Sequence, residues 1–90
     1  MIPEGAIDIE YTVRAVLRDV LGLSEERTAA FHAETPLFGA LPELDSMAVA
    51  GVLTEIEDRL GILIEDDDID GDTLATFGSL TRFATGKTVQ

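Results

Sequence analysis

The sequence contains no cysteine, which excludes disulfide bonds and thiolate metal sites. Tryptophan is absent too, and aromatic residues make up only 6% of the chain. A core built from this composition must therefore consist mainly of aliphatic side chains.

Long apolar runs are also missing. No run approaches the roughly 20 residues that cross a bilayer, and the opening Met-Ile-Pro-Glu is unlike a signal peptide. We therefore expect a cytoplasmic protein with no membrane segment. Ninety residues suit one small core, so we expect a single domain over residues 1–90 that works as a monomer. The 46% hydrophobic content is too high for a disordered tail.

Basic residues are scarce, since six lysines and arginines face 18 acids and the formal net charge is −12. A surface this negative repels nucleic acid and anionic lipid, and it attracts basic partner proteins. Acidity that serves solubility alone is the alternative.

Helical spacing dominates the apolar pattern. Gly22 can end a first helix that starts after Asp8, a candidate N-cap. Glu10 and Arg14 are spaced to form an ion pair on this helix. Its predicted buried stripe consists of Ile9, Val13, Val16, Leu17, Val20 and Leu21.

A long connection over residues 24–44 follows, punctuated by proline and glycine, with room for a short helical turn at "SEERTAAF". A connection of this length needs anchors in the core, and we expect Phe38 and Leu41 to provide them.

A second strong helix is predicted from Asp45 or Ser46 to Leu60, with Gly61 as its stop. Its predicted buried face consists of Val49, Val52, Leu53, Ile56 and Leu60.

The chain then continues as a tucked loop with a short helical turn around Ile69. A last helix opens at Asp72 or Thr73, with Gly86 beyond its end. Leu74, Phe77, Leu80 and Ala84 should face inward on it. The predicted fold is all-α, a small antiparallel four-helix bundle of three main helices and one short one, with a long first connection.

One face of the second helix carries residues whose identity is not explained by packing in the core. At 100° per residue, Met47, Gly51, Thr54 and Asp58 lie opposite the predicted buried stripe. Met47 is then an exposed, flexible apolar side chain, a type suited to partner surfaces. A glycine inside a helix costs stability, so Gly51 indicates a close approach by another group. A tolerated surface glycine is the alternative.

Two residues of the capping type, Asp45 and Ser46, stand side by side where this helix starts. A helix needs only one N-cap. If Asp45 caps, Ser46 is the first helical residue and its hydroxyl faces solvent. A phosphate ester there would meet free backbone N–H groups and the positive end of the helix dipole.

With these residues, the sequence resembles the acyl carrier proteins, the phosphopantetheine-bearing carrier family. The likeness covers most of the chain, and its position after a long loop makes the Asp-Ser pair specific. The segments that carry it are "LDSM" (44–47), "AVAGVLTEIEDRLGI" (48–62), "IEDDDID" (64–70) and "TLATFGSLTRFATGK" (73–87).

The resemblance implies that Ser46 carries 4′-phosphopantetheine and that Asp45 is the acid before it. A phosphopantetheinyl transferase would install this arm from coenzyme A. An acyl-loading ligase or transferase and acyl-processing enzymes would then act on a thioester at its tip. The protein itself would be a tether and no enzyme.

The resemblance also implies a docking surface for those enzymes. Met47 and Gly51 would contribute to it near the serine. Glu55, Glu57 and Asp58 would meet basic docking surfaces.

This chain departs from the family pattern beyond the serine. Carriers of bacterial fatty acid synthesis generally have acids two and five positions after it, where this chain has Ala48 and Gly51. We therefore expect a specialised lipid or secondary-metabolite pathway, with a peptidyl or aryl carrier of a non-ribosomal pathway as the alternative.

Calcium binding is the main rival interpretation. Asp66, Asp68 and Asp70 alternate before Gly71, as at the start of a helix–loop–helix calcium site. Phe77 stands where that motif requires a bidentate glutamate, so the sequence favours at most weak divalent binding there. Nucleophilic catalysis by Ser46 lacks a base, because the only histidine, His32, lies in the long connection. A carrier-like interaction domain that has lost the modification is the remaining alternative.

Overall fold

The computed structural model describes the backbone of residues 4–88 and the side chains of residues 9–88. This part of the chain forms four α-helices and no sheet, as predicted. Three are long and one is short: α1 (Glu4–Leu21), α2 (Glu25–Ala29), α3 (Ser46–Leu60) and α4 (Phe77–Thr88). A short 3-10 helix, η1 (Asp66–Asp68), lies between α3 and α4.

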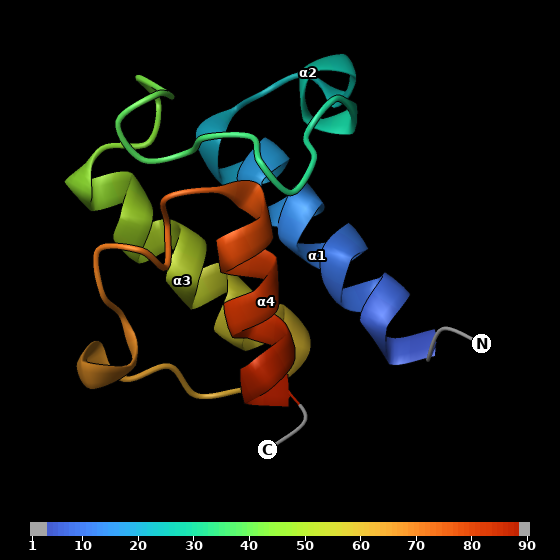
Figure 1. Ribbon diagram of the computed structural model, residues 1–90, viewed down its shortest axis with the longest axis vertical. Helices are drawn as coiled ribbons and strands as arrows, with labels where there is room; N and C mark the ends of the chain where they lie inside the picture. Colours follow the sequence, from blue (N-terminus) through green and yellow to red (C-terminus); the bar gives the residue numbers. More distant parts are fainter. Residues whose placement is uncertain (1–3, 89–90) are drawn as a thin grey trace.

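Helix α1 is the shared partner of the other helices. It packs against α3, α4 and α2, and it runs opposite in direction to both α3 and α4 (Figure 1). Of the helices in residues 4–88, none has the length and apolarity that crossing a bilayer requires.

The apolar stripe of α1 is buried as predicted, except that Val20 is only half-buried against the core. Gly22 ends the helix with φ 69°, a left-handed conformation that glycine adopts without strain. The helix begins at Glu4, however, so the prediction of a start at Asp8 was wrong. The residues Gly5 and Ala6 do not stop a helix, and helical hydrogen bonding extends back through them.

Arg14 joins three parts of the molecule. Its guanidinium donates hydrogen bonds to the carbonyls of Thr28 and Phe31 at the end of α2, and it forms the predicted ion pair with Glu10, at 2.9 Å. It also lies 4.8 Å from the centre of the Phe77 ring at the start of α4. Such a cation–π contact and the two carbonyl bonds hold α2 and α4 against α1.

The long connection contains α2, at the predicted site of a helical turn, and Ser24 caps it by accepting from the N–H of Arg27. The predicted anchor Leu41 packs partly against the core, whereas the prediction for Phe38 was wrong. Leu37 is fully buried instead, and Phe38 is 52% exposed.

The reason is an extended pairing with the segment before α4. The N–H groups of Leu37 and Phe38 donate to the carbonyls of Ala75 and Leu74, next to an isolated bridge between Pro36 and Thr76. Leu37 is buried next to this bridge, and Phe38 begins the turn that follows, in which the N–H of Ala40 donates to the carbonyl of Leu37, so Phe38 lies outside the core.

Helix α3 buries Val52 and Ile56 completely and ends at Gly61, with φ 65°. Val49, Leu53 and Leu60 are only half-buried. The buried face is thus centred between Val52 and Ile56 and rotated from the predicted stripe toward Ala48, which packs against the core.

The segment between α3 and α4 differs in detail from the prediction. Its helical turn is η1, which starts with a capping pair of Glu65 and Asp68 and ends before Ile69, whose backbone is extended. Asp70 then accepts hydrogen bonds from the N–H and hydroxyl of Thr73, which holds this stretch as a turn.

Helix α4 consequently begins at Phe77 rather than at Asp72 or Thr73. Thr76 and Ser79 cap this start, each backbone N–H donating to the other residue's hydroxyl. Gly86 lies inside the helix, which continues to Thr88. The four predicted inward residues, Leu74, Phe77, Leu80 and Ala84, are all buried.

The first turn of α4 lies directly on the long connection. The N–H groups of Phe77 and Gly78 donate to the carbonyls of Thr35 and Ala33, at 2.8 and 2.9 Å. A Cβ built on Gly78 would lie 2.6 Å from the carbonyl oxygen of Ala33 and 2.9 Å from its Cα. Both are backbone atoms, so only glycine fits here.

We predict that Gly78→Ala destabilises the fold by about 1–3 kcal/mol, because the connection must move away from α4. The measurement is urea denaturation followed by circular dichroism. Gly86→Ala is the matched control on the same helix, where an added Cβ meets nothing within 4 Å. It should stabilise by up to about 1 kcal/mol through helix propensity. Equal effects of the two substitutions would contradict the importance of this contact.

Candidate functional site

The start of α3 has the arrangement that the paired capping residues suggest. Asp45 is the N-cap, and its Oδ1 accepts a hydrogen bond from the N–H of Ala48 at 2.8 Å. Ser46 is the first helical residue and is exposed. The serine is not needed to cap the helix, and it lies at the surface.

The helix surface that follows Ser46 is uncharged. The stretch from Ser46 to Thr54 contains no charged residue, and the first turn contains no acid. Met47 is 86% exposed, the largest exposed fraction among the large apolar side chains of residues 9–88. The prediction of an exposed apolar residue beside the serine is confirmed.

An open groove of about 440 Å³ adjoins Ser46. Three segments line it: Phe38 from the long connection, Ser46 and Val49 from α3, and Ile69, Asp70, Gly71 and Leu74 from the turn before α4. Sequence reasoning missed this groove, because it depends on the pairing that turns Phe38 outward. The only sequence signal was an aromatic residue eight positions before the serine.

Gly51 does not lie on the outer face, contrary to the prediction. It is half-buried, and a Cβ at this position would lie 3.3 Å from Cγ1 of Val20 on α1. The close approach that the glycine indicated is therefore internal to the fold. Thr54 and Asp58, predicted for the same face, are exposed.

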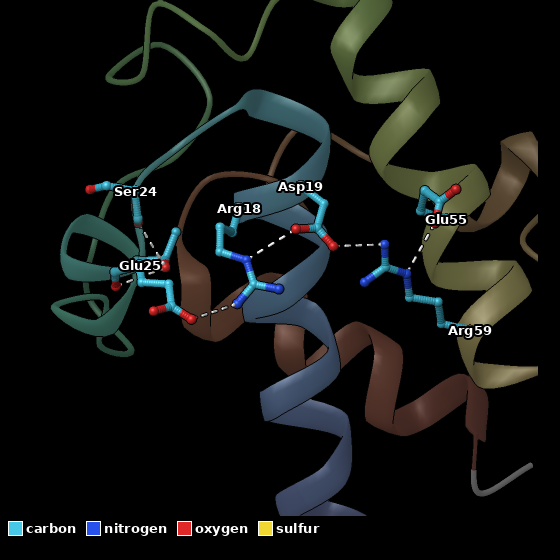
Figure 2. Close-up of polar contacts among 7 residues, drawn as sticks. Arg18, Asp19, Ser24, Glu25, Glu55 and Arg59 are labelled. Atoms are coloured by element: carbon cyan, nitrogen blue, oxygen red, sulfur yellow. Dashed lines mark hydrogen bonds and ion pairs between the residues drawn. The ribbon is translucent and has the colours of Figure 1, made fainter.

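Two of the three acids predicted for docking are engaged within the molecule. Glu55 pairs with Arg59 at 3.0 Å, and Arg59 also pairs with Asp19 of α1 at 3.0 Å. The chain of ion pairs continues through Arg18 to Glu25 at the start of α2, as Figure 2 shows. It connects α3, α1 and α2 across the surface.

Asp19 is the centre of this network. Hydrogen bonds from the Arg18 and Arg59 guanidinium groups hold the pKa of Asp19 below its ordinary value of 3.8. A lowered pKa means that these contacts stabilise the fold above pH 3.8, and that their contribution is lost as the pH falls below it. The contribution is small, because all these side chains are partly exposed.

Glu57 is also engaged, since its Oε2 accepts a hydrogen bond from the N–H of Ile64 at 2.7 Å. This bond ties the loop after α3 back to the helix. Among the acids of α3, only Asp58 has no hydrogen-bond or ion-pair partner within the described residues.

The acidic turn does not bring its carboxylates together. Asp68 pairs with Lys87 at 2.9 Å, and Oδ1 of Asp70 accepts a hydrogen bond from the N–H of Asp72 in its own turn. Two hydrogen bonds lower the pKa of Asp68, and the bond from the N–H of Glu65 has a larger effect than the bond from Lys87. Within residues 9–88, no three metal-ligating side chains converge on one point. Phe77, at the glutamate position of the calcium motif, belongs to the core.

His32 is exposed, and its Nδ1 accepts a hydrogen bond from the N–H of Glu34 in the same loop. It therefore helps to shape a turn of the long connection.

Comparison with protein families gives a match to the phosphopantetheine attachment site family over residues 12–84. The chain belongs to this family. The fold also matches the solution NMR structure of the holo acyl carrier protein of Nitrosomonas europaea, with a TM-score of 0.81 and 41% sequence identity. That match covers 91% of this chain and 96% of the other. Comparison with curated protein sequences gave no significant match.

The protein is thus a carrier of 4′-phosphopantetheine with an acyl-carrier-like fold, and it is not an enzyme. The residues at the start of α3 fit such a group. An exposed hydroxyl adjoins an apolar groove, and the first helical turn carries no acid that would repel a phosphate. The free N–H groups of this turn, and with them the positive end of the helix dipole, face the same region.

We predict that Asp45→Ala destabilises the carrier protein by about 0.5–2 kcal/mol, because the first turn of α3 loses its cap. Asp45→Asn should retain most of the stability, since asparagine caps equally well. Thermal and urea denaturation of both variants test this. A loss as large in the asparagine variant would mean that the negative charge, rather than the cap, is what matters.

Proposed function

We propose that Ser46 is the attachment residue and that this carrier presents acyl intermediates to partner enzymes. The observation that carries the proposal is the division of roles at the start of α3. Asp45 holds the helix start through its bond to Ala48, so the Ser46 hydroxyl is left exposed. When bound, 4′-phosphopantetheine supplies a terminal thiol that holds the cargo as a thioester.

The chain's own residues would then hold the attachment point in place and cover part of the cargo. A rigid helix start fixes the position of the Ser46 oxygen in every enzyme that the carrier visits. The apolar walls of the adjoining groove, Phe38, Val49 and Leu74 among them, suit the hydrocarbon part of an acyl group. With no cysteine in the chain, the arm would be its only thiol.

The partners that we propose are a phosphopantetheinyl transferase, an acyl-loading ligase or transferase, and acyl-processing enzymes. The net charge of −12 would attract enzymes with basic docking surfaces. Asp58, Asp66 and Asp67 supply exposed charge for this encounter. We further propose that residues 1–90 work as one monomeric domain in the cytoplasm, which the single core cluster supports.

We predict that incubation with coenzyme A and a broad-specificity phosphopantetheinyl transferase adds one phosphopantetheine group, seen by intact-mass spectrometry. Ser46→Ala should abolish the addition. Ser24→Ala is the matched control, because Ser24 is also an exposed serine at a helix start. Modification of the Ser46→Ala protein, or none of the wild type, would contradict the assignment.

The pathway that we propose is a specialised one, in lipid or secondary metabolism. The support is the absence of acids at Ala48 and Gly51, both of which are half-buried on the side of the helix that faces the bundle. An aminoacyl or aryl cargo in a non-ribosomal pathway is the alternative cargo class.

We predict that the phosphopantetheine-bearing protein is a poor acceptor for a standard malonyl transferase, and that its acylated form is a poor substrate for a standard fatty acid ketosynthase. The reason is the missing charge beside the serine, where carriers of that pathway generally have acids. Initial rates would be measured beside those of a carrier from bacterial fatty acid synthesis. Normal turnover would contradict the specialised assignment.

A further inference from the structure

Residues 38–43, near the end of the long connection, have little apolar anchoring. Leu37 and Leu44 are buried on either side of this segment, whereas four of its six residues are exposed. The other two, Leu41 and Glu43, are half-buried, and Glu43 carries the only polar side chain of the segment. A loop with few buried side chains needs other contacts to hold its position.

Glu43 is held by Arg27 of the short helix α2. Its two carboxylate oxygens accept hydrogen bonds from Nη1 and Nη2 of Arg27, at 2.7 and 3.3 Å. The side chain of Glu43 is 33% exposed and that of Arg27 is 44% exposed. The hydrogen bond from Arg27 holds the pKa of Glu43 below its ordinary value of 4.5, so the pair is ionised at neutral pH. Two N–H···O bonds between the same groups fix an orientation as well as a distance.

Helix α2 is itself attached to α1. The Arg14 guanidinium of α1 donates hydrogen bonds to the carbonyls of Thr28 and Phe31 at the end of α2. Thr28 is buried, and Arg18 of α1 pairs with Glu25 at 3.6 Å. None of these contacts involves the loop segment before α3, so α2 is a support to which that segment can be tied.

The ion pair lies two residues before the N-cap of α3. Glu43 is followed by the buried Leu44, by the cap Asp45 and by Ser46. A buried side chain fixes one point of the chain and leaves the backbone free to turn about that point. The bond from Arg27 to Glu43 supplies a second fixed point. Helix α2 and the start of α3 lie at the same end of the bundle (Figure 1).

We propose that Arg27 is a positioning residue for the modification of Ser46. By holding Glu43 against α2, it fixes the direction in which the chain enters α3 and so the place of the serine hydroxyl. This inference rests on the proposed attachment at Ser46. With the pair broken, only a fraction of the molecules has the start of α3 in place for a modifying enzyme. The apparent KM then rises by the inverse of that fraction, while kcat is unchanged because the bound chain is ordered in either case.

The experiment uses the unmodified protein, coenzyme A and a broad-specificity phosphopantetheinyl transferase. Initial rates by intact-mass spectrometry give kcat and KM for the wild type, Arg27→Gln, Glu43→Gln and the double variant that carries both changes. Each single variant should raise KM about 2- to 5-fold, the range over which one exposed ion pair shifts an equilibrium. The double variant should raise KM no further, because all three variants lose the same interaction. The value of kcat should not change.

Net charge separates positioning from long-range steering. Arg27→Gln adds one negative charge to the net charge of −12, and Glu43→Gln removes one. Steering would therefore move KM in opposite directions in the two variants, whereas loss of positioning raises it in both. The double variant has the wild-type net charge, so steering cannot explain a raised KM there.

Arg82→Gln is the matched control for charge. Arg82 is exposed on α4 and forms no ion pair within residues 9–88. Its replacement adds the same negative charge as Arg27→Gln without breaking a contact of the long connection. KM should therefore stay near the wild-type value.

The reversed pair separates positioning from direct contact with the transferase. Arg27→Glu combined with Glu43→Arg keeps the net charge and can form the ion pair in the opposite sense. KM should then return to within about twofold of the wild type. If either side chain instead bound the enzyme directly, the reversed pair would raise KM at least as much as the single variants.

Amide hydrogen exchange gives a readout that needs no enzyme. The N–H of Ala48, which donates to Asp45 at the start of α3, should exchange faster in Arg27→Gln than in the wild type. The N–H of Val16, in the core of α1, should exchange equally fast in both. The melting temperature should change little, because an exposed ion pair contributes little to global stability.

An unchanged KM in the single variants, opposite shifts in the two, or equal effects of Arg82→Gln and Arg27→Gln would overturn the inference. The absence of recovery in the reversed pair would do so too. All these results would leave attachment at Ser46 intact. Failure of the transferase to modify the wild type would instead count against the proposed function, and the wild-type mass distinguishes the two cases.

Discussion

Like-charge repulsion is the constraint under which this fold holds together, because 18 acids share a small surface with six basic side chains. Five of the six bases form ion pairs within residues 9–88, and most of these pairs join separate parts of the chain. Arg18 and Arg59 meet at Asp19 and join α1 to α2 and α3, while Arg14 holds the end of α2 and the ring of Phe77. The basic residues thus offset the repulsion among acids where helices and loops meet. Burial of the aliphatic core supplies the remaining stability.

The location of the site follows from this organisation. Helix α1 packs against α3, α4 and α2, so each of these depends on α1 for its position. The face of α3 toward α1 is closely packed, since a Cβ on Gly51 would lie 3.3 Å from Cγ1 of Val20. The start of α3 emerges from the long connection, and the outward Phe38 and the turn before α4 line the groove beside it. Ser46 is therefore exposed, because the side chains of α3 that are fully buried in the core, Val52 and Ile56, lie farther along the helix.

The parts of the fold that sequence reasoning predicted correctly are those set by local chemistry. The stripe of α1, the left-handed glycines Gly22 and Gly61, and the capping role of Asp45 all depend on neighbours along the chain. The errors at Phe38 and at the start of α4 share one cause, the pairing of residues 33–38 with residues 74–78. That pairing turns Phe38 outward and requires glycine at position 78, and the start of α4 lies within it. Contacts between segments this far apart leave no periodic signal in the sequence. The rotation of α3 that buries Gly51 is likewise decided by how α1 packs.

The combination of a large negative charge with an uncharged start of α3 suits a carrier. If partner enzymes act in turn at Ser46, as proposed, each complex has to form quickly and dissociate quickly. Net charge accelerates formation without lengthening the life of the complex, since steering acts mainly on the association rate. Met47, the most exposed large apolar side chain of residues 9–88, offers little area for a lasting contact. Its unbranched, flexible side chain can also repack against differently shaped entrances. The large negative charge and the small exposed apolar area would thus complement each other in a carrier that visits several enzymes.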